Sequence, residues 1–290
     1  MKLGLVLEGG ASRTLFSCGV LDFFLDKELI ADYLIGTSAG IAYGVSYASA
    51  QRGRNLEITK KYMADARYMG VKHLLNRRNR SYYNMDFVYD EIPNELIPFD
   101  YEKFAAFRGD VVATVTNIAT GEAEYIPVDR SDRKFIALRA SCALPMLFPQ
   151  IQIGESFYMD GGIADSIPFE QALRSGCDKV IVVLTREKGY VKHTEKTTLA
   201  AKLFYRKHPK FAQAIAARAE HYNNAVRRLR ELEREGKAFV ITPRTTLGTS
   251  RTESDPHKLT ALYKIGYTQA KSCYRELTAF MNQTSPAAVR

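Results

Sequence analysis

Residues 2–40 read KLGLVLEGGASRTLFSCGVLDFFLDKELIADYLIGTSAG, and their pattern sets the class of fold. The apolar run 2–7 predicts a buried strand, and residues 14–29 have the periodicity of an amphipathic helix. Residues 33–35 predict a second strand, and the small residues of 38–50 predict a second helix. This strand–helix–strand–helix order is typical of an α/β fold in which helices cover a parallel sheet.

The same kind of pattern continues further along the chain. Residues 110–117 (DVVATVTN) predict a strand, and residues 123–128 return after a Thr-Gly-Glu turn as its hairpin partner. Residues 179–184 (KVIVVL) form a continuous apolar run, which is typical of a strand covered on both faces. We therefore expect a mostly parallel central sheet with an antiparallel hairpin.

Two regions differ from this layered core in composition. Residues 55–105 lack strand signals and are rich in Tyr, Met and Arg, which we interpret as a helical cap inserted into a domain of residues 1–190. Residues 191–290 are basic and carry long helical patterns over 197–237 and 257–280. This part is expected to be a basic, helical C-terminal extension.

The chain of 290 residues has a formal net charge of +9, concentrated in residues 60–80 and 195–237. Such patches favour an anionic partner such as a membrane surface, although solvated helix faces explain them equally well. The apolar start of the chain is too short for a signal peptide, and no run approaches the ~18 residues of a membrane span. We expect a cytoplasmic protein that contacts a membrane peripherally at most.

Nucleic acid is an unlikely partner for the arginine runs at 77–80 and 227–230. Single-stranded nucleic acid is bound through aromatic side chains interleaved with the basic ones. Only Tyr82 and Tyr83 lie near the first run. The runs therefore argue weakly for this class of protein.

The motif Gly36-Thr37-Ser38-Ala39-Gly40 matches the G-x-S-x-G pattern of a nucleophile elbow. It follows a predicted strand and opens a predicted helix, so the serine would project at the sheet edge while the helix N-terminus favours negative charge there. The motif alone is weak, because a plain strand–helix turn with serine as helix cap has the same appearance.

A second glycine-rich loop, Glu8-Gly9-Gly10-Ala11-Ser12-Arg13, follows the first predicted strand. Acyl transfer develops an oxyanion that needs convergent backbone N–H donors, and glycines allow a loop to present them. Two neighbouring parallel strands would bring both loops to one edge of the sheet. Nucleotide binding is disfavoured, because neither the P-loop pattern nor G-x-G-x-x-G is met.

A nucleophilic serine needs a general base that accepts its proton. Asp160 ends a short predicted strand and is followed by Gly161 and Gly162, which also occurs in ordinary hairpin turns. None of the five histidines stands in a glycine-rich loop after a core strand. A Ser–Asp dyad therefore explains the residues better than a Ser–His–Asp triad, provided that a partly desolvated site strengthens the carboxylate as a base.

Four segments, taken in order, give the chain a family resemblance. LVLEGGASRTLFSCGVLDFF (5–24), IGTSAG (35–40), ASCALPMLFP (140–149) and YMDGGIADSIP (158–168) resemble the bacterial branch of the patatin-like phospholipases. The order and spacing of four motifs are far more specific than any one of them. The resemblance covers residues 1 to about 185, and DPHKLTALYKIGYTQAK near the C-terminus is similar to the extension of one bacterial subgroup.

The resemblance implies a three-layer α/β/α fold and a Ser–Asp dyad, with Ser38 as nucleophile and Asp160 as general base. It also implies an oxyanion hole at Gly9, Gly10 and Ala11. The supporting residues that it implies are Arg13, Gly36, Gly40, Gly161 and Gly162.

Two positions depart from the family pattern, which usually has glycine where Ala11 and Thr14 stand. If position 11 needs a positive φ, alanine costs about 1 kcal/mol or more. A misaimed oxyanion donor typically lowers the rate by roughly 100- to 1000-fold.

We expect a hydrolase that cleaves fatty-acyl esters of lipids or phospholipids, with no cofactor and no metal. A catalytically weak or inactive member of the same fold that binds a lipid or a protein is the alternative.

Overall fold

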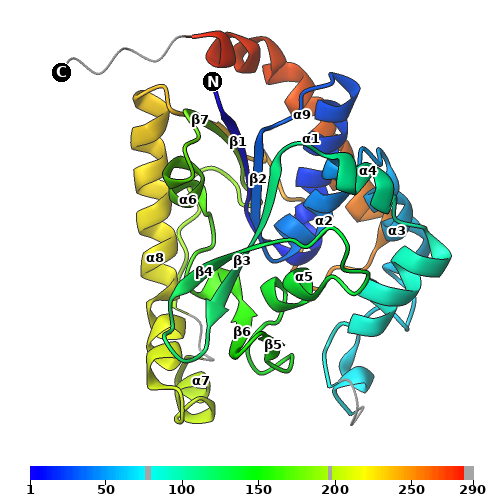
Figure 1. Ribbon diagram of the computed structural model, residues 1–290, viewed down its shortest axis with the longest axis vertical. Helices are drawn as coiled ribbons and strands as arrows, with labels where there is room; N and C mark the ends of the chain where they lie inside the picture. The colour runs from blue at the N-terminus through cyan, green and yellow to red at the C-terminus, as the bar shows by residue number, and fades with distance from the viewer. Residues whose placement is uncertain (76–79, 195–197, 284–290) are drawn as a thin grey trace.

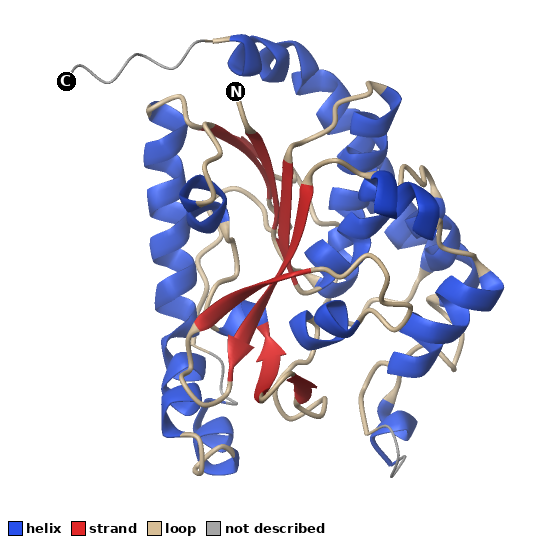
Figure 2. Ribbon diagram, in the orientation of Figure 1, coloured by secondary structure: helices blue, strands red, loops and turns tan. Residues whose placement is uncertain are grey.

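A computed structural model describes residues 1–75, 80–194 and 198–283. One eight-stranded sheet runs through the molecule in the order β5-β6-β3-β2-β1-β7-β8, with β4 paired to β3. Figure 2 shows this sheet between two groups of helices. The strands are β1 (Leu3–Leu7), β2 (Tyr33–Thr37), β3 (Asp110–Asn117), β4 (Ala123–Pro127), β5 (Ile151–Ile153), β6 (Ser156–Asp160), β7 (Lys179–Val183) and β8 (Ala238–Ile241).

The parallel part of the sheet comprises β3, β2, β1, β7 and β8. All five residues of β1, β2 and β7 are buried, as continuous apolar runs in a parallel sheet require. Consecutive residues of β1 alternate between two cores: Leu5 and Leu7 join one, and Val6 joins the other. The expected mostly parallel α/β fold is confirmed.

The antiparallel part lies beyond β3. The predicted hairpin is present, with Thr114 of β3 opposite Tyr125 of β4. Further along β3, β6 also pairs antiparallel to it, and β5 pairs with β6 at the edge of the sheet. The sequence did not indicate β5, because a strand of three residues is too short to show a period of two.

Helices cover both faces of the sheet, so the molecule has three layers (Figure 1). One layer contains α6 and α8. The buried residues of α6, together with Tyr222, Leu229 and Leu232 of α8, belong with Val6 and Ile35 in one core. The other contains α1, α2 and α9 with the cap beside them. The helices are η1 (Ala11–Thr14), α1 (Leu15–Asp26), α2 (Ala39–Ala48), α3 (Arg54–Tyr62), η2 (Val71–Leu75), η3 (Phe87–Leu96), α4 (Tyr101–Ala106), α5 (Ile136–Ser141), η4 (Gly161–Ile163), α6 (Phe169–Arg174), α7 (Thr198–Phe204), α8 (Pro209–Arg234) and α9 (Pro256–Asn282).

The region after residue 190 takes part in these layers. β8 extends the parallel sheet beside β7, and α9 packs along α1. The two helices approach at Gly19 and Gly266, where an added Cβ on Gly266 would collide with the carbonyl oxygen of Phe16. Glycine therefore allows the backbones of α1 and α9 to touch.

The segment interpreted as a cap contains α3, η2, η3 and α4, with one isolated bridge between Met69 and Tyr83. η3 is a π-helix that contains Pro93. Proline has no backbone N–H, so the helix lacks one hydrogen-bond donor at this position. Within the described ranges, no helix combines the length and the apolar character needed to cross a bilayer.

Candidate active site

Ser38 stands at the sharp turn between β2 and α2 that the G-x-S-x-G motif predicts. Its backbone has φ 54° and ψ −131°, a strained conformation for a residue with a side chain. Such strain costs about 1–3 kcal/mol and persists only where neighbours enforce it. Here the Ser38 N–H donates to Oγ of Ser141 at 2.8 Å, and that hydroxyl donates to the Thr114 carbonyl at 2.7 Å.

The register of β3 brings Asp160 to this turn. Thr37, the last residue of β2, is the partner of Thr114, and the next residue, Val115, is the partner of Asp160 on β6. Adjacent strands lie about 4.8 Å apart, so one strand separates the serine turn from the aspartate. Ser38 and Asp160 line the same cavity. The two loops meet at this cavity.

The Asp160 carboxyl is almost fully buried. Its Oδ1 accepts a hydrogen bond from the Gly162 N–H at 2.8 Å. Its Oδ2 forms no hydrogen bond with any of the described residues. Burial raises the pKa of Asp160, and the charge of Arg218 and the side chain of Ser38 oppose that rise. A carboxylate with a raised pKa and a vacant oxygen is a better proton acceptor than a solvated one.

The predicted oxyanion loop lies against the serine turn. An added Cβ on Gly9 would stand 2.7 Å from the Thr37 carbonyl oxygen and 2.9 Å from Cβ of Ser38, so only glycine allows this approach. Thr185 lies just after β7, and its Oγ1 donates to the Gly9 carbonyl at 3.1 Å, which holds the loop in place. In the described part of the chain, the N–H groups of Gly10 and Ala11 donate to no protein acceptor.

Ala11 has φ 49°, so this position does require the left-handed region, where alanine is strained. The loop nevertheless adopts this conformation with alanine in place of glycine. Thr14, the second departure from the family pattern, is fully buried at the end of η1.

The supporting residues surround the same site. Gly36 lies near the end of β2 against the start of α2, and Gly40 lies in the first turn of α2 beside the end of β1. Gly161 and Gly162 begin η4 directly after Asp160. Arg13 is buried, and its guanidinium donates to the Thr249 carbonyl at 3.5 Å.

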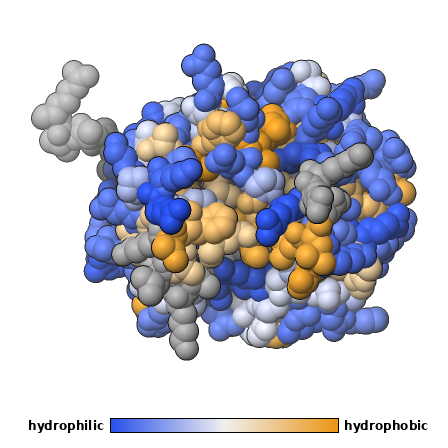
Figure 3. All heavy atoms as spheres, turned by 90° about the horizontal axis from the view of Figure 1, so that it is seen from below, coloured by the Kyte–Doolittle hydropathy of each residue, from blue (hydrophilic) through white to orange (hydrophobic). Residues whose placement is uncertain are grey.

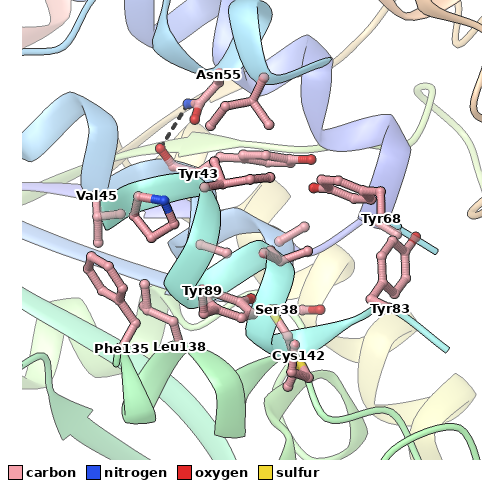
Figure 4. A pocket seen from close by; sticks show the side chains of 18 of the residues that line it. Ser38, Tyr43, Val45, Asn55, Tyr68, Tyr83, Tyr89, Phe135, Leu138 and Cys142 are labelled. Atoms are coloured by element: carbon pink, nitrogen blue, oxygen red, sulfur yellow. Dashed lines mark hydrogen bonds between the residues drawn. The ribbon is translucent and has the colours of Figure 1, made fainter. Parts of the chain in front are cut away.

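Two cavities meet at Ser38, and one of them is apolar. The cap contributes nearly half of its lining residues, including Met63, Tyr68, Tyr83 and Met85 from the segment rich in Tyr and Met. In the view of Figure 4, Tyr89 lies to the left of Ser38, Tyr68 and Tyr83 lie to its right, and Cys142 lies just below it. Burial raises the pKa of the Cys142 thiol to about 12, so this neighbour stays protonated at neutral pH.

The other cavity, called the polar cavity below, contains Ser38 and Asp160. Ser38, Ala11 and Leu144 line both cavities, so the serine stands at their junction. Five cationic side chains line the polar cavity: Arg13, Arg186, Lys192, Arg218 and Arg251.

Several of these residues come from segments to which the sequence assigned no catalytic part. Nε of Arg218, on α8, donates to the Gly162 carbonyl at 2.7 Å and so holds the loop that follows Asp160. The Arg251 carbonyl accepts from the Ser12 N–H at 3.4 Å and from its hydroxyl at 3.0 Å. No local signal separates Arg218 from the other arginines of a basic helix, whereas Ser141 lies inside the quoted motif at 140–149.

The structure describes the second arginine run, at residues 227–230, but only the last residue of the first run, at residues 77–80. Residues 76–79, with most of the first arginine run, lie outside the described residues. In the second run, Arg228 forms ion pairs with Glu231 and Glu235 on the face of α8. Such pairs satisfy part of its charge within the helix.

Comparison with known proteins finds two curated relatives and one similar solved structure. The chain is 25% identical over 189 residues to the "Uncharacterized protein YjjU" of Escherichia coli (strain K12), which covers 63% of this chain and 52% of that protein. It is 26% identical over 191 residues to the "Lysophospholipase nte1" of Aspergillus niger, covering 63% of this chain and 12% of that protein. VipD from Legionella pneumophila has a TM-score of 0.46 and 14% identity, covering 95% of this chain and 67% of that one.

The chain thus spans about half the length of the first relative and a small part of the second. A family model described as "Domain of unknown function (DUF6363)" matches residues 208–282, which include α8, β8 and α9. The model described as "Patatin-like phospholipase" matches residues 5–173, more than half of the chain. The protein belongs to the patatin-like phospholipase family.

Proposed function

We propose that the protein is a serine acyl hydrolase that cleaves fatty-acyl esters of lipids, with Ser38 as nucleophile and Asp160 as general base. The observation that carries the proposal is the position of Ser38. Its strained turn stands between an apolar cavity and a cavity that contains a buried carboxylate with a vacant oxygen. Strain of this kind is concentrated at functional sites.

The proposed chemistry begins with attack of the Ser38 hydroxyl oxygen on the ester carbonyl carbon, while Asp160 accepts the hydroxyl proton. The N–H groups of Gly10 and Ala11 stabilise the negative charge on the carbonyl oxygen. Collapse breaks the bond to the alcohol, which leaves with the proton from Asp160. Water, deprotonated by Asp160, then attacks the acyl-Ser38 ester, and the fatty acid departs as the proton returns to Ser38.

The apolar cavity supports a fatty-acyl group as the acyl part of the substrate. It opens at Ser38 and is lined mainly by aliphatic and aromatic side chains from α2, α5 and the cap. An acyl chain placed there would bury apolar surface, at about 25 cal/mol per Å² removed from water. Its carbonyl would then lie at the junction of the two cavities.

A fluorophosphonate probe tests the nucleophile. We expect the probe to label Ser38. The Ser38→Ala variant should not be labelled, and its rate of ester hydrolysis should fall by at least about 1000-fold. Cys142→Ala is the matched control, since the thiol lies beside Ser38 in the same cavity. Labelling that persists in Ser38→Ala and disappears in Cys142→Ala would reject Ser38 as the nucleophile.

The alternative is a non-catalytic lipid or protein binder on the same fold, and the strained Ala11 is the observation that favours it. This protein would bind an acyl lipid in the apolar cavity without being labelled by the probe. Binding without labelling or turnover would replace the hydrolase proposal with this one.

We further propose that the protein approaches its substrate at a lipid surface. An exposed apolar rim supports this proposal; it comprises Val71, Leu75, Met146, Leu147, Leu203 and Phe204. The Met146 N–H donates to the Tyr205 hydroxyl just after α7, and the Tyr82 N–H donates to the Leu147 carbonyl, so the loop 146–147 connects α7 to the cap. Figure 3 shows hydrophobic side chains gathered on this end of the molecule.

A further inference from the structure

One wall of the apolar cavity contains a buried arginine. Among the described residues that line this cavity, Arg54 alone carries a charge at neutral pH, and it is the first residue of α3. Only 9% of Arg54 is exposed. A buried cation loses its water, which is unfavourable unless an anion or a full set of hydrogen-bond acceptors replaces the water. Burial of a hydrocarbon chain uses no charge, so the proposed function by itself gives Arg54 no part.

The protein groups around Arg54 satisfy only part of its guanidinium. Nη2 donates to the Ile97 carbonyl at 3.0 Å, and Nη1 donates to Oγ of Ser46 at 3.5 Å. Nε has no hydrogen-bond acceptor among the described residues. Burial lowers the pKa of Arg54 to about 10, so the side chain stays charged at neutral pH. Within the described ranges no carboxylate forms an ion pair with it, and the acid of the same helix, Glu57, is exposed and pairs with Lys61 at 2.6 Å.

Arg54 lies at the end of the apolar cavity that is far from Ser38. Ser46, which accepts from Arg54, comes eight residues after Ser38 along α2, and a helix rise of 1.5 Å per residue makes this about 12 Å. In Figure 4, Asn55, the neighbour of Arg54 in the chain, lies at the top of the view, and Ser38 lies near the bottom. A zigzag of carbon–carbon bonds, each about 1.5 Å long, needs roughly nine carbons to cover most of this distance.

We propose that Arg54 binds a carboxylate at the far end of the substrate's acyl chain. The inference rests on the proposed function and names its acyl class: chains of roughly nine carbons that carry an ester at one end and a carboxylate at the other. A carboxylate offers two oxygens to the Nε–H and to a further N–H of one guanidinium. Because Arg54 is already out of water, only the carboxylate loses its water on binding, and the pair gains the attraction of a buried charge that has no counter-ion.

Two pairs of chromogenic esters test the inference with the wild-type protein. Mono(4-nitrophenyl) nonanedioate is compared with 4-nitrophenyl nonanoate, and mono(4-nitrophenyl) hexanedioate with 4-nitrophenyl hexanoate, so each pair differs only in a terminal carboxylate or methyl group. A carboxylate that stops short of Arg54 is buried without a partner, which is unfavourable. The ratio of kcat/KM, carboxylate over methyl, should therefore be at least about 10-fold higher for the longer pair. Equal ratios at both lengths would overturn the proposal.

Variants at two nearby arginines identify the residue responsible. Arg54→Gln should lower the ratio for the nonanoyl pair about 10-fold, and Arg54→Lys should restore part of it. Arg52→Gln is the matched control, because it removes the same charge from an exposed side chain that pairs with Asp26 outside the cavity lining, and it should leave the ratio unchanged. A proportional loss for both nonanoyl esters in Arg54→Gln would indicate a structural part only and would count against the inference. If Arg54→Gln does not fold, the two ester pairs with wild-type protein decide the inference.

A binding measurement separates failure of this inference from failure of the proposed function. If Ser38 is neither labelled nor active, the proposed function fails, and calorimetry with Ser38→Ala protein decides the inference separately. The probes are monomethyl nonanedioate and dimethyl nonanedioate, which differ in the terminal charge. We expect saturable binding of the monomethyl ester that is tighter than that of the dimethyl ester and that Arg54→Gln weakens. Equal affinity for the two esters, or no binding of the monomethyl ester, would reject the inference.

Discussion

At the scale of one residue, the proposed role of Asp160 as a base and its burial have opposite effects on its charge. As a base it must be ionised, yet its burial favours the neutral form and raises its pKa above the ordinary 3.8. The folded protein thus binds the Asp160 proton more tightly than the unfolded chain does. Stability falls as pH rises through the window between the two pKa values, and the penalty persists above it.

Asp160→Asn should therefore raise the melting temperature at pH 7, since the amide is neutral and can still accept from Gly162 through its oxygen. The same substitution should lower ester hydrolysis about 100-fold or more, through loss of the base. Thermal unfolding at pH 7 and pH 3 measures the first effect, which should shrink at pH 3, where the wild-type carboxyl is protonated too. An equal difference in melting temperature at both pH values would contradict a charge-burial cost.

The pH profile of hydrolysis depends on the same carboxyl. Activity on an uncharged ester should fall as pH decreases through the raised pKa of Asp160, so the acid limb of kcat/KM should have its midpoint above 3.8. Arg218 is the strongest of the groups that lower this pKa. Arg218→Gln should move the acid limb to higher pH, and a limb that does not move would show that Arg218 acts only by holding the Gly162 loop.

Ala11 gives a separate prediction about the oxyanion loop. Because its backbone already has φ 49°, Ala11→Gly should relieve strain without changing the conformation. The relief of about 1–2 kcal/mol is partly offset by the greater chain entropy of glycine, about 0.4–1 kcal/mol. We expect a gain in unfolding free energy near 1 kcal/mol in urea titrations and a kcat within a few-fold of wild type. A 100-fold rise in kcat would instead mean that alanine misaims an oxyanion donor.

At the scale of elements, α9 and α1 are joined by a contact between backbones. Gly266→Ala would place a methyl group against the Phe16 carbonyl. Overpacking costs about 1–3 kcal/mol, whereas alanine gains up to about 1 kcal/mol over glycine in a free helix. We expect a net loss of stability in chemical denaturation. Thr268→Ala, at an exposed position of α9, is the control that should show no loss.

The elements also differ in how far the sequence predicts them. β1, β2, β7 and the β3–β4 hairpin follow from apolar runs and a turn. The short strand that ends at Asp160 was predicted and is present as β6, but β5 and the antiparallel pairing at this edge of the sheet were not predicted. Strand direction and edge pairing depend on which partner is available in space, and a short run of residues does not encode that.

The whole molecule carries its apolar rim at one end, where α7 and the cyan segment of the cap reach the bottom of Figure 1. Exposed Lys72, Arg206 and Lys207 accompany this rim. Apolar side chains that insert into a bilayer and cations that meet anionic lipid act together in peripheral binding. The net charge of +9 acts in the same direction.

We therefore expect the protein to float with vesicles that contain phosphatidylglycerol more than with neutral vesicles, and high salt should reduce this difference. Leu203→Glu combined with Phe204→Glu should weaken flotation, because both changes remove exposed apolar area and add negative charge. Ile30→Glu is the control, since it changes an exposed apolar residue outside the rim. Flotation unaffected by the double substitution would assign membrane contact, if any, to another face.

The sequence by itself determined the layered α/β class and the family. It also singled out Ser38, Asp160 and the glycine-rich loop, whose roles in catalysis stay predictions. These features are local, because apolar runs define strands and short glycine-containing motifs define the turns after them. Only the tertiary structure decided what surrounds Ser38: an apolar cavity from the cap on one side and cations from distant segments on the other. Arg218 and Arg251 reach the site through the packing of α8 and the loop before α9, and nothing in the local pattern of either segment specifies that neighbour.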